Sequence, residues 1–194
     1  ETVGYHLVRR PTAALDEGQA ASATIESVAE NLTDSLIAPV CFFLAGGVVG
    51  AAVYRVINTS DSVLGFRRGP LEYFGKSAAR LDDFVNLIPA RIAGLSLVAG
   101  AALAGESPGG ALAALRRDRR RTQSPNSGWP MSAMAGALGV TLEKPGVHRL
   151  GAGALPIAPD IERAVRVVAA ASAVSVALAV FVFAAGAMVL GPAR

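Results

Sequence analysis

The sequence predicts an all-α, polytopic integral membrane protein in which transmembrane helices are combined with re-entrant or interfacial ones. Hydrophobic residues make up 52% of the chain and charged residues only 17%, a balance too apolar for an ordinary soluble domain. Two segments, 35–54 and 167–192, carry no charge, and each is long enough to cross a bilayer as one helix. Proline and glycine interrupt the first segment, which is typical of a broken or re-entrant helix.

Composition also limits the partners and the chemistry. The formal net charge is +3, but no basic stripe is interleaved with aromatic residues, so we expect no nucleic-acid partner. Charges that flank membrane segments, or an anionic ligand, account for the excess better. The single cysteine, Cys41, excludes an intramolecular disulfide. His6 and His148 have no ligand-like partner at helical spacing, so we expect both to be structural or solvated.

The first part of the chain is polar. It begins at Glu1 without an initiator methionine, so we expect a processed product or a fragment of a longer protein. Pro11 follows two arginines and breaks any helix there. Residues 20–36 are predicted to form a helix of small and apolar residues, and residues 1–194 to form a single membrane-embedded domain.

An acidic face lies on this predicted helix where it meets the first apolar segment. Glu26, Glu30 and Asp34 stack on one side at 100° per residue, with Asn31 one step around the helix. Because residues 35–54 are uncharged, the three acids stand at the edge of a membrane-like segment. They form either a solvated helix face or a polar site at the membrane interface that binds a cation or a polar substrate.

Pro39, Gly46, Gly47 and Gly50 leave two possible paths for segment 35–54. If the segment crosses the membrane once, the polar groups before and after it end on opposite sides. If it is a hairpin that turns at the glycines, both polar ends face the same compartment.

Polar groups recur at helical spacing after this segment. Arg55 and Asn58 share a helical face, and Asp61 follows Asn58 by three positions. Residues 65–70 form a loop that contains two adjacent arginines, the first of which is Arg67.

A third polar stretch runs into the next apolar segment. Arg80, Asp83 and Asn86 lie three residues apart, and Asp82 precedes Asn86 by four. An ion pair between Arg80 and Asp83 would contribute only about 0.2–0.5 kcal/mol. Such a pair does not account for Asp82, Asn86 and Arg91 in the same short stretch.

The second half of the chain alternates apolar and basic segments. Residues 92–105 are apolar but short for a membrane span. Residues 116–121 place arginines around one aspartate, either as a cytoplasmic flank of a membrane helix or as a phosphate clamp. Residues 131–140 are predicted to form a helix, and residues 146–159 a loop broken by glycine and proline.

Segment 167–192 is the clearest transmembrane helix in the sequence, because it is uncharged throughout. Arg163 and Arg166 flank its start, which indicates that this end lies in the cytoplasm.

Several common catalytic motifs are missing. The sequence contains neither a P-loop nor a dinucleotide-binding glycine motif, and it has no nucleophile elbow or His-Glu-x-x-His pair. Carboxylates, amides and arginines near apolar segments remain. Such groups hold Mg²⁺ through one or two carboxylates plus substrate phosphates, while arginines bind the other phosphate oxygens. Residue chemistry alone therefore indicates a membrane protein that handles a phosphorylated or otherwise anionic ligand.

Four polar motifs occur in a fixed order. They are residues 26–34 (ESVAENLTD), residues 55–61 (RVINTSD), residues 79–91 (ARLDD followed by NLIPAR), and residues 124–139 (SPNSGWP followed by AMAGALG). Together they resemble the CobD/CbiB family of cobalamin biosynthesis, the adenosylcobinamide-phosphate synthases. The resemblance covers the motif-bearing core, residues 14–142, and family members continue upstream with further apolar segments.

The resemblance implies a carbon–nitrogen ligase. The expected reaction is ATP-dependent amide formation between adenosylcobyric acid, a corrinoid, and the amine of an aminopropanol phosphate or a related amino-alcohol, with Mg²⁺. The expected location is the cell membrane, where a multi-pass protein meets the lipid bilayer and its active site faces the cytoplasm.

The resemblance also assigns roles to residues. Catalytic roles are implied for Glu26, Glu30, Asp34, Asp82 and Asp83, of which Glu30, Asp34 and Asp83 are the expected metal ligands. The implied substrate-binding residues are Asn31, Arg55, Asn58, Asp61, Arg67, Arg80, Asn86, Arg91, Ser124, Asn126 and Trp129. Spacing does not decide which carboxylate acts as the base.

Two other classes of function fit parts of the pattern. The synthase family resembles the AmpE-like membrane proteins, which suggests a sensor or regulatory protein without turnover. A transporter would also place polar groups beside broken helices. A single active site requires the four motifs to lie on one side of the membrane, so we expect segment 35–54 or segment 92–105 to be re-entrant or interfacial.

Overall fold

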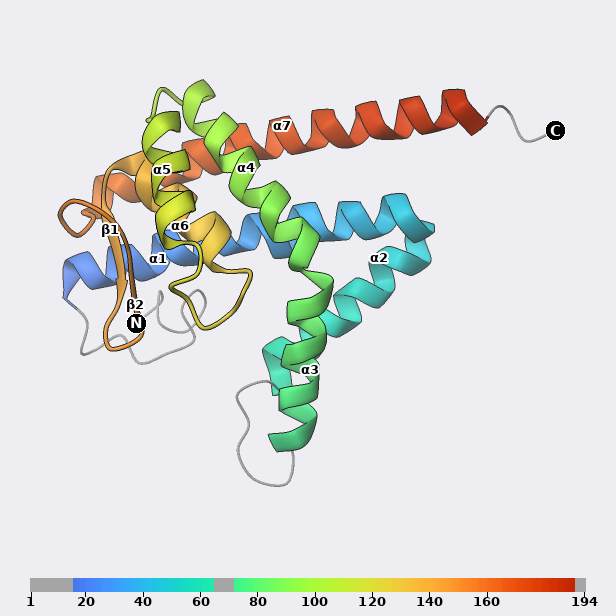
Figure 1. The fold of residues 1–194 in the computed structure, drawn as a ribbon, viewed down its shortest axis with the longest axis horizontal. Coiled ribbons are helices and arrows are strands. Elements are labelled where there is room, and N and C mark those ends of the chain that lie inside the picture. The colour runs from blue at the N-terminus through green and yellow to red at the C-terminus, as the bar shows by residue number, and fades with distance from the viewer. Residues whose placement is uncertain (1–15, 65–71, 191–194) are drawn as a thin grey trace.

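The computed structural model describes residues 16–64 and 72–190, which form helices and one short β-hairpin (Figure 1). The elements are α1 (Glu17–Leu32), η2 (Thr33–Ile37), α2 (Ala38–Leu64), α3 (Glu72–Val85), α4 (Leu87–Leu103), α5 (Pro108–Asp118), α6 (Gly128–Leu138), β1 (Thr141–Lys144), β2 (His148–Gly151) and α7 (Ala158–Leu190). The predicted all-α membrane fold is confirmed.

Two helical stretches of the described chain are long and apolar enough to cross a membrane. They are Glu17–Leu64 and Ala158–Met188, and the second contains most of the segment predicted from its uncharged run. The bent pair formed by α3 and α4 meets the same test as a broken or re-entrant span. Length and composition identify these helices, because a helix that crosses a membrane needs about 20 apolar residues.

A capping box starts α1. The Asp16 side chain accepts a hydrogen bond from the Gln19 backbone N–H at 2.7 Å, and the Gln19 side chain accepts one from the Asp16 N–H. This reciprocal arrangement satisfies two N–H groups that a helix start leaves unpaired. Ile25 and Ala29 then recur at a helical spacing and are fully buried against the other helices.

The first apolar segment turns back on itself at Gly46 and Gly47. Gly46 (φ −142°) and Gly47 (φ +61°) leave the helical conformation, and Figure 1 shows the chain reversing there. Arg55 Nη1 then donates to the Asp34 backbone oxygen at 3.4 Å. In a straight helix, residues this far apart in sequence would be separated by about 30 Å. The two polar ends of the segment therefore lie together.

Two further contacts close this helical hairpin. The rings of Phe42 and Tyr54 stack with centroids 5.3 Å apart. A Cβ atom on Gly50 would lie 2.3 Å from the Phe42 carbonyl oxygen, so only glycine permits this approach of the two arms. Of the two paths that the sequence allows, the structure takes the one that turns at the glycines.

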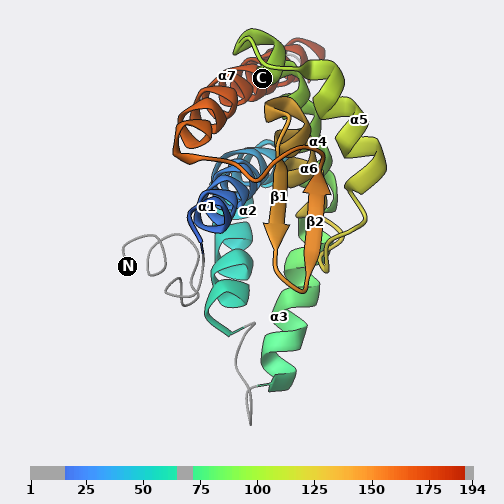
Figure 2. The same cartoon turned by 90° about the vertical axis from the view of Figure 1, so that its left-hand side faces the viewer.

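Helices α3 and α4 meet at an angle of 54° around Asn86. Figures 1 and 2 show α3 and the end of α2 projecting together from the packed helices. Helix α3 exposes Tyr73, Phe74 and Phe84, whereas Asp82 and Asp83 line a pocket on its other side. The helix therefore has one strongly apolar and one strongly polar face.

Small residues let α4, α5, α6 and α7 approach closely. A Cβ atom on Gly100 of α4 would lie 2.8 Å from the Val167 carbonyl oxygen of α7, and one on Gly136 of α6 would lie 2.2 Å from the Gly110 oxygen. Packing through glycine and alanine suits helices in a lipid environment, where association depends on close contact.

Residues 146–159, predicted to be a loop, contain a β-strand instead. Strand β2 pairs antiparallel with β1, in a register that sets Thr141 opposite Gly151 and Lys144 opposite His148. Gly146, at φ +73°, forms the turn between the strands. The loop prediction was wrong because the strands are too short for a visible alternation, and contacts distant in the sequence hold them.

Asp118 is one of these distant contacts. Its fully buried carboxylate accepts hydrogen bonds from the Gly151 N–H at 2.9 Å and from Arg117 at 2.7 and 2.9 Å, and it pairs with Arg121 at 3.2 Å. Burial alone would raise the pKa of Asp118, but the hydrogen bonds from Arg117 and Gly151 hold the pKa below its ordinary value. Asp118, itself held by two arginines of the basic run, therefore anchors the β-hairpin to the end of α5.

We expect Asp118→Asn to lower the free energy of unfolding by about 1–3 kcal/mol, because it weakens hydrogen bonds to a buried, charged acceptor. The lowered pKa means that the ionised group stabilises the fold above the unfolded-state pKa of about 4. This contribution disappears as the pH falls through the lower folded-state pKa. Thermal unfolding in detergent should therefore show the largest difference from wild type at neutral pH. Exposed Glu162→Gln is the control, and an unchanged melting temperature for Asp118→Asn would contradict the anchor.

Candidate functional site

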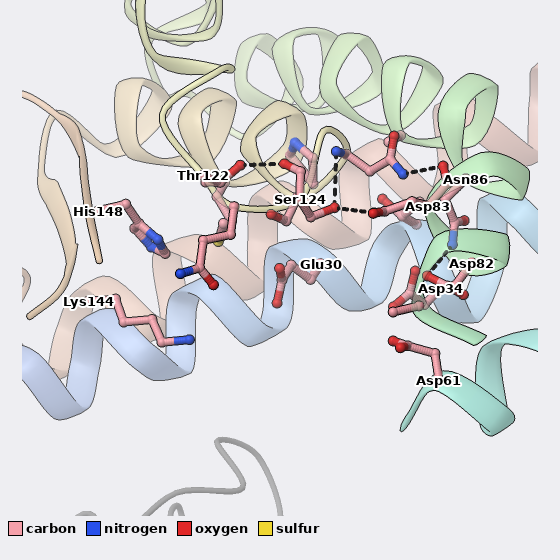
Figure 3. A pocket seen from close by; sticks show the side chains of 18 of the residues that line it. Glu30, Asp34, Asp61, Asp82, Asp83, Asn86, Thr122, Ser124, Lys144 and His148 are labelled. Carbon is pink, nitrogen blue, oxygen red and sulfur yellow. Dashed lines mark hydrogen bonds between the residues drawn. The ribbon is translucent and has the colours of Figure 1, made fainter. Parts of the chain in front are cut away.

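A pocket of about 850 Å³ lies between α1, η2, α3, the loop before α6, and the β-hairpin (Figure 3). The carboxylates that line it come from three parts of the chain: Glu30, Asp34, Asp61, Asp82 and Asp83. The helical hairpin at Gly46 and Gly47 makes this possible, because it returns Asp61 to the level of Asp34.

Hydrogen bonds fix the orientation of Asp82. Asn58 donates to one carboxylate oxygen at 3.2 Å, and Asn86 donates to the other at 3.0 Å. The buried Tyr54 hydroxyl donates in turn to the Asn86 side-chain oxygen at 3.1 Å. Side chains from α2 and from the bend between α3 and α4 therefore hold one acid of the pocket in place.

The motif at 124–130 supports Asp83. Ser124 Oγ donates to the Asp83 carboxylate at 2.8 Å, and the Asn126 amide donates to the Asp83 backbone oxygen at 2.7 Å. Arg91 donates to the Asn126 side-chain oxygen at 2.7 Å and lies 4.9 Å from the centre of the Trp129 ring. Ser124 and Asn126 line the pocket, whereas Arg91 and Trp129 stand behind that wall.

Glu30 and Asp34 reach the pocket at the junction of α1 and η2. Segment η2 is π-helical, and such wider turns inside α-helices are frequent at functional sites. The Glu30 carboxylate forms no hydrogen bond or ion pair with another described residue, and the buried Thr33 Oγ1 also lacks a hydrogen-bond partner. Unsatisfied buried groups at a pocket are typical of a site that a ligand completes.

The β-hairpin supplies pocket residues that sequence reasoning missed. Lys144 and His148 line the pocket, together with Thr122 and Gln123. Of the two alternatives predicted for His148, structural or solvated, the structure excludes the second, because the side chain is only 6% exposed and its Nε2 atom lies 3.5 Å from Glu26. No spacing signal connects Lys144 or His148 to the acids, because the hairpin itself was not visible in the sequence.

The pocket is strongly acidic. Against five carboxylates, Lys144 is the one lysine or arginine among its described lining residues. Like charges in a partly desolvated site repel one another strongly, so the pocket favours a cationic group or a metal ion. Within the described residues, however, no three His, Cys, Asp or Glu side chains gather closely enough to hold a metal ion by themselves.

Several residues of the expected site lie outside the pocket wall. Asn31 and Arg80 are exposed, and Asn31 donates to the Ser27 backbone oxygen. Among the described residues, Arg80 forms no ion pair with Asp83. Arg55 bonds the Asp34 backbone from an exposed position.

Glu26 and Arg67 are two further residues of the expected site. Glu26 lies behind His148 rather than in the pocket wall. Arg67 lies outside the described residues. The proposed roles of all these side chains in binding or catalysis remain predictions.

Comparison with known proteins extends over most of the chain. A sequence model of the family described as CobD/Cbib protein matches residues 2–180. Cobalamin biosynthesis protein CobD of Dehalococcoides mccartyi is 47% identical over 79% of this chain and 50% of its own length. The probable cobalamin biosynthesis proteins CobD of Methanothermobacter thermautotrophicus and Thermococcus kodakarensis are 49% and 45% identical, over 75% and 83% of this chain.

The chain spans about half the length of these curated relatives. No solved structure matches it significantly. The match to the family nevertheless includes all four polar motifs and every carboxylate of the pocket. The chain therefore belongs to the CobD/CbiB protein family.

Proposed function

We propose that this protein acts in cobalamin biosynthesis as an adenosylcobinamide-phosphate synthase. It would join the carboxylate of adenosylcobyric acid to the amine of an aminopropanol phosphate or a related amino-alcohol phosphate, with ATP as co-substrate. The observation that carries the proposal is the acidic pocket, because the motifs that characterise the family supply its carboxylates and the side chains that orient them.

The chemistry requires an activated carboxylate. The corrinoid carboxylate would attack the γ-phosphate of ATP, giving an acyl phosphate and ADP. The amine nitrogen would then attack the acyl carbon, the C–O bond to phosphate would break, and inorganic phosphate would leave. A carboxylate of the pocket would take the proton that the amine loses. Glu30 suits this role, because no described side chain forms a hydrogen bond or ion pair with it.

The carboxylates of the pocket are compatible with Mg²⁺ if substrate phosphates supply the remaining ligands. Mg²⁺ is commonly bound through one or two carboxylates plus substrate phosphates rather than by a complete protein cage, which fits a pocket without a cluster of three ligands. Glu30, Asp34 or Asp83 would hold the ion together with phosphate oxygens. Bound there, Mg²⁺ would offset negative charge on the transferring phosphoryl group.

A site at the cytoplasmic surface of the cell membrane completes the proposal. ATP is available on that side, and Arg163 and Arg166 at the start of α7 favour the same orientation under the positive-inside rule. Corrinoids are bulky and amphipathic, which suits a pocket beside exposed apolar helix faces such as that of α3.

The test is a reconstitution assay. Protein purified in detergent is incubated with adenosylcobyric acid, aminopropanol phosphate, ATP and Mg²⁺, and the corrinoids are analysed by mass spectrometry. The expected result is a corrinoid heavier by the amino-alcohol phosphate minus one water, formed only when ATP is present. Binding of these compounds without any such product would contradict the proposal and favour a sensor without turnover.

A further inference from the structure

The pocket has two ends of opposite character. Asp34, Asp61, Asp82 and Asp83 gather at one end, and the β-hairpin forms the other (Figure 3). Glu30 lies between the two ends in the same view. Where no metal ion offsets their charge, the four aspartates repel a negatively charged ligand and direct it towards the hairpin.

The hairpin brings Lys144 and His148 together. In its register these residues are direct cross-strand partners, and directly opposed side chains on one face of an antiparallel pair lie about 5 Å apart. Both residues line the pocket, and Figure 3 shows their side chains beside each other at its edge. Arg149, the next residue of β2, points to the opposite face, where its side chain is 67% exposed.

Neither side chain of this pair forms a hydrogen bond with another described residue. The Lys144 ammonium forms no hydrogen bond or ion pair with another described residue. The His148 side chain is 6% exposed, and its Nε2 atom lies 3.5 Å from a Glu26 carboxylate oxygen without forming a hydrogen bond. A buried polar atom without a hydrogen bond costs about 1–3 kcal/mol, so His148 favours a ligand that supplies one, and the half-buried Lys144 places an ammonium group beside it.

The backbone that carries the pair is held at both strands. The backbone N–H of Glu143, beside Lys144, donates to Ser22 Oγ at 2.7 Å. The N–H of Gly151, at the end of β2, donates to the buried Asp118. Each strand is therefore fastened to a different helix, and the backbone positions of the two residues are fixed before any ligand arrives, which reduces the entropy lost on binding.

We propose that Lys144 and His148 form a phosphate-binding subsite at the hairpin end of the pocket. The inference rests on the proposed function, and it specifies where a phosphorylated substrate of that reaction places its phosphate. Lys144 binds the phosphate oxygens as a point charge, and His148, which lines the same part of the pocket, supplies a hydrogen bond. Either the amino-alcohol phosphate or the phosphates of ATP provide this chemistry.

The polarity of the pocket also suits a ligand with two charges. An amino-alcohol phosphate carries an ammonium group at one end and a phosphate at the other. With its phosphate on Lys144 and His148, its nitrogen extends towards Glu30 and the aspartates, where a cation is favoured and where a carboxylate is available to accept a proton.

Direct binding tests the subsite without turnover. Calorimetry on the detergent-solubilised protein measures the dissociation constants of aminopropanol phosphate and of a non-hydrolysable ATP analogue, each with Mg²⁺. Lys144→Met is expected to weaken one of the two by about tenfold or more, because it removes a charge-assisted contact. His148→Gln should weaken the same compound, and Lys144→Arg should retain most of the affinity. The compound affected identifies which phosphate occupies the subsite.

Arg149→Met is the matched control, because it removes one positive charge from the same hairpin on the face away from the pocket. It should leave both dissociation constants unchanged. Equal weakening by Arg149→Met and Lys144→Met would mean a non-specific charge effect and would overturn the subsite. Wild-type protein that binds neither compound, or Lys144→Met protein that binds both as wild type does, would also overturn it.

The binding experiment separates the subsite from the proposed function. If Lys144→Met forms the amide product with the same dependence on substrate concentration as wild type, the subsite is refuted and the synthase activity stands. If the protein forms no product but its binding of the phosphate compound depends on Lys144, the subsite stands and the synthase activity is refuted. A thermal unfolding curve for each variant confirms that the protein compared is folded.

Discussion

Glu30→Gln is expected to reduce amide formation by about 100-fold or more, the usual contribution of a positioned acid–base group. Glu30 lies between the Lys144 and His148 end of the pocket and the four aspartates. Glutamine has nearly the same shape, but it neither accepts a proton from an attacking amine nor binds a cation as a carboxylate does. Rates of corrinoid amide formation under single-turnover conditions measure the effect.

Stability distinguishes a lost function from a lost fold. Because no described side chain forms a hydrogen bond or ion pair with the Glu30 carboxylate, glutamine should leave the melting temperature unchanged or raise it. Glu17→Gln, the same change at an exposed position in the first turn of α1, should alter neither rate nor stability. Turnover retained by Glu30→Gln would remove Glu30 from the reaction.

Asn86→Ala is expected to lower the free energy of unfolding by about 2–4 kcal/mol, because it leaves the buried Tyr54 hydroxyl without an acceptor and removes one of the two hydrogen bonds that orient the half-buried Asp82. Asn86 is 2% exposed, accepts a hydrogen bond from the fully buried Tyr54 hydroxyl and donates one to Asp82. It also occupies the bend between α3 and α4. Losing it should therefore disorder the acidic end of the pocket and reduce activity as well as stability.

Tyr54→Phe provides the comparison for Asn86→Ala. It removes only the hydroxyl that donates to Asn86, so the expected loss is about 1 kcal/mol. Thermal unfolding in detergent, followed by intrinsic fluorescence, measures both variants under the same conditions. If Asn86→Ala is no more destabilising than Tyr54→Phe, the bond from Asn86 to Asp82 contributes nothing measurable to the fold.

The helical features and the acidic part of the site could be predicted from the sequence, because both depend on local patterns. Uncharged runs predicted the apolar helices, and glycines 46 and 47 predicted that the first segment could turn back. Spacing placed Asp82, Asp83 and Asn86 on one polar face, and the structure brings that face against the chain near Asp34 and Asn126.

The rest of the site could not be predicted because it depends on contacts distant in sequence. Lys144 and His148 reach the pocket only through a hairpin that Ser22 and Asp118 hold in place, and two strands of four residues leave too little periodicity to detect. Several arginines that the sequence offered for phosphate contacts also have partners within the protein, which depend on the fold. Arg117 and Arg121 pair with Asp118, and Arg91 supports Asn126 from behind.

The reversal at Gly46 and Gly47 changes how the topology of this protein should be counted. A helix that enters a bilayer and returns adds no net crossing, although a hydropathy plot scores its apolar length as one pass. Counting the hairpin as one pass would assign every later segment to the wrong side of the membrane. When the two arms of the hairpin are counted together as no crossing, Asp34 and Asp61 lie on the same side of the membrane.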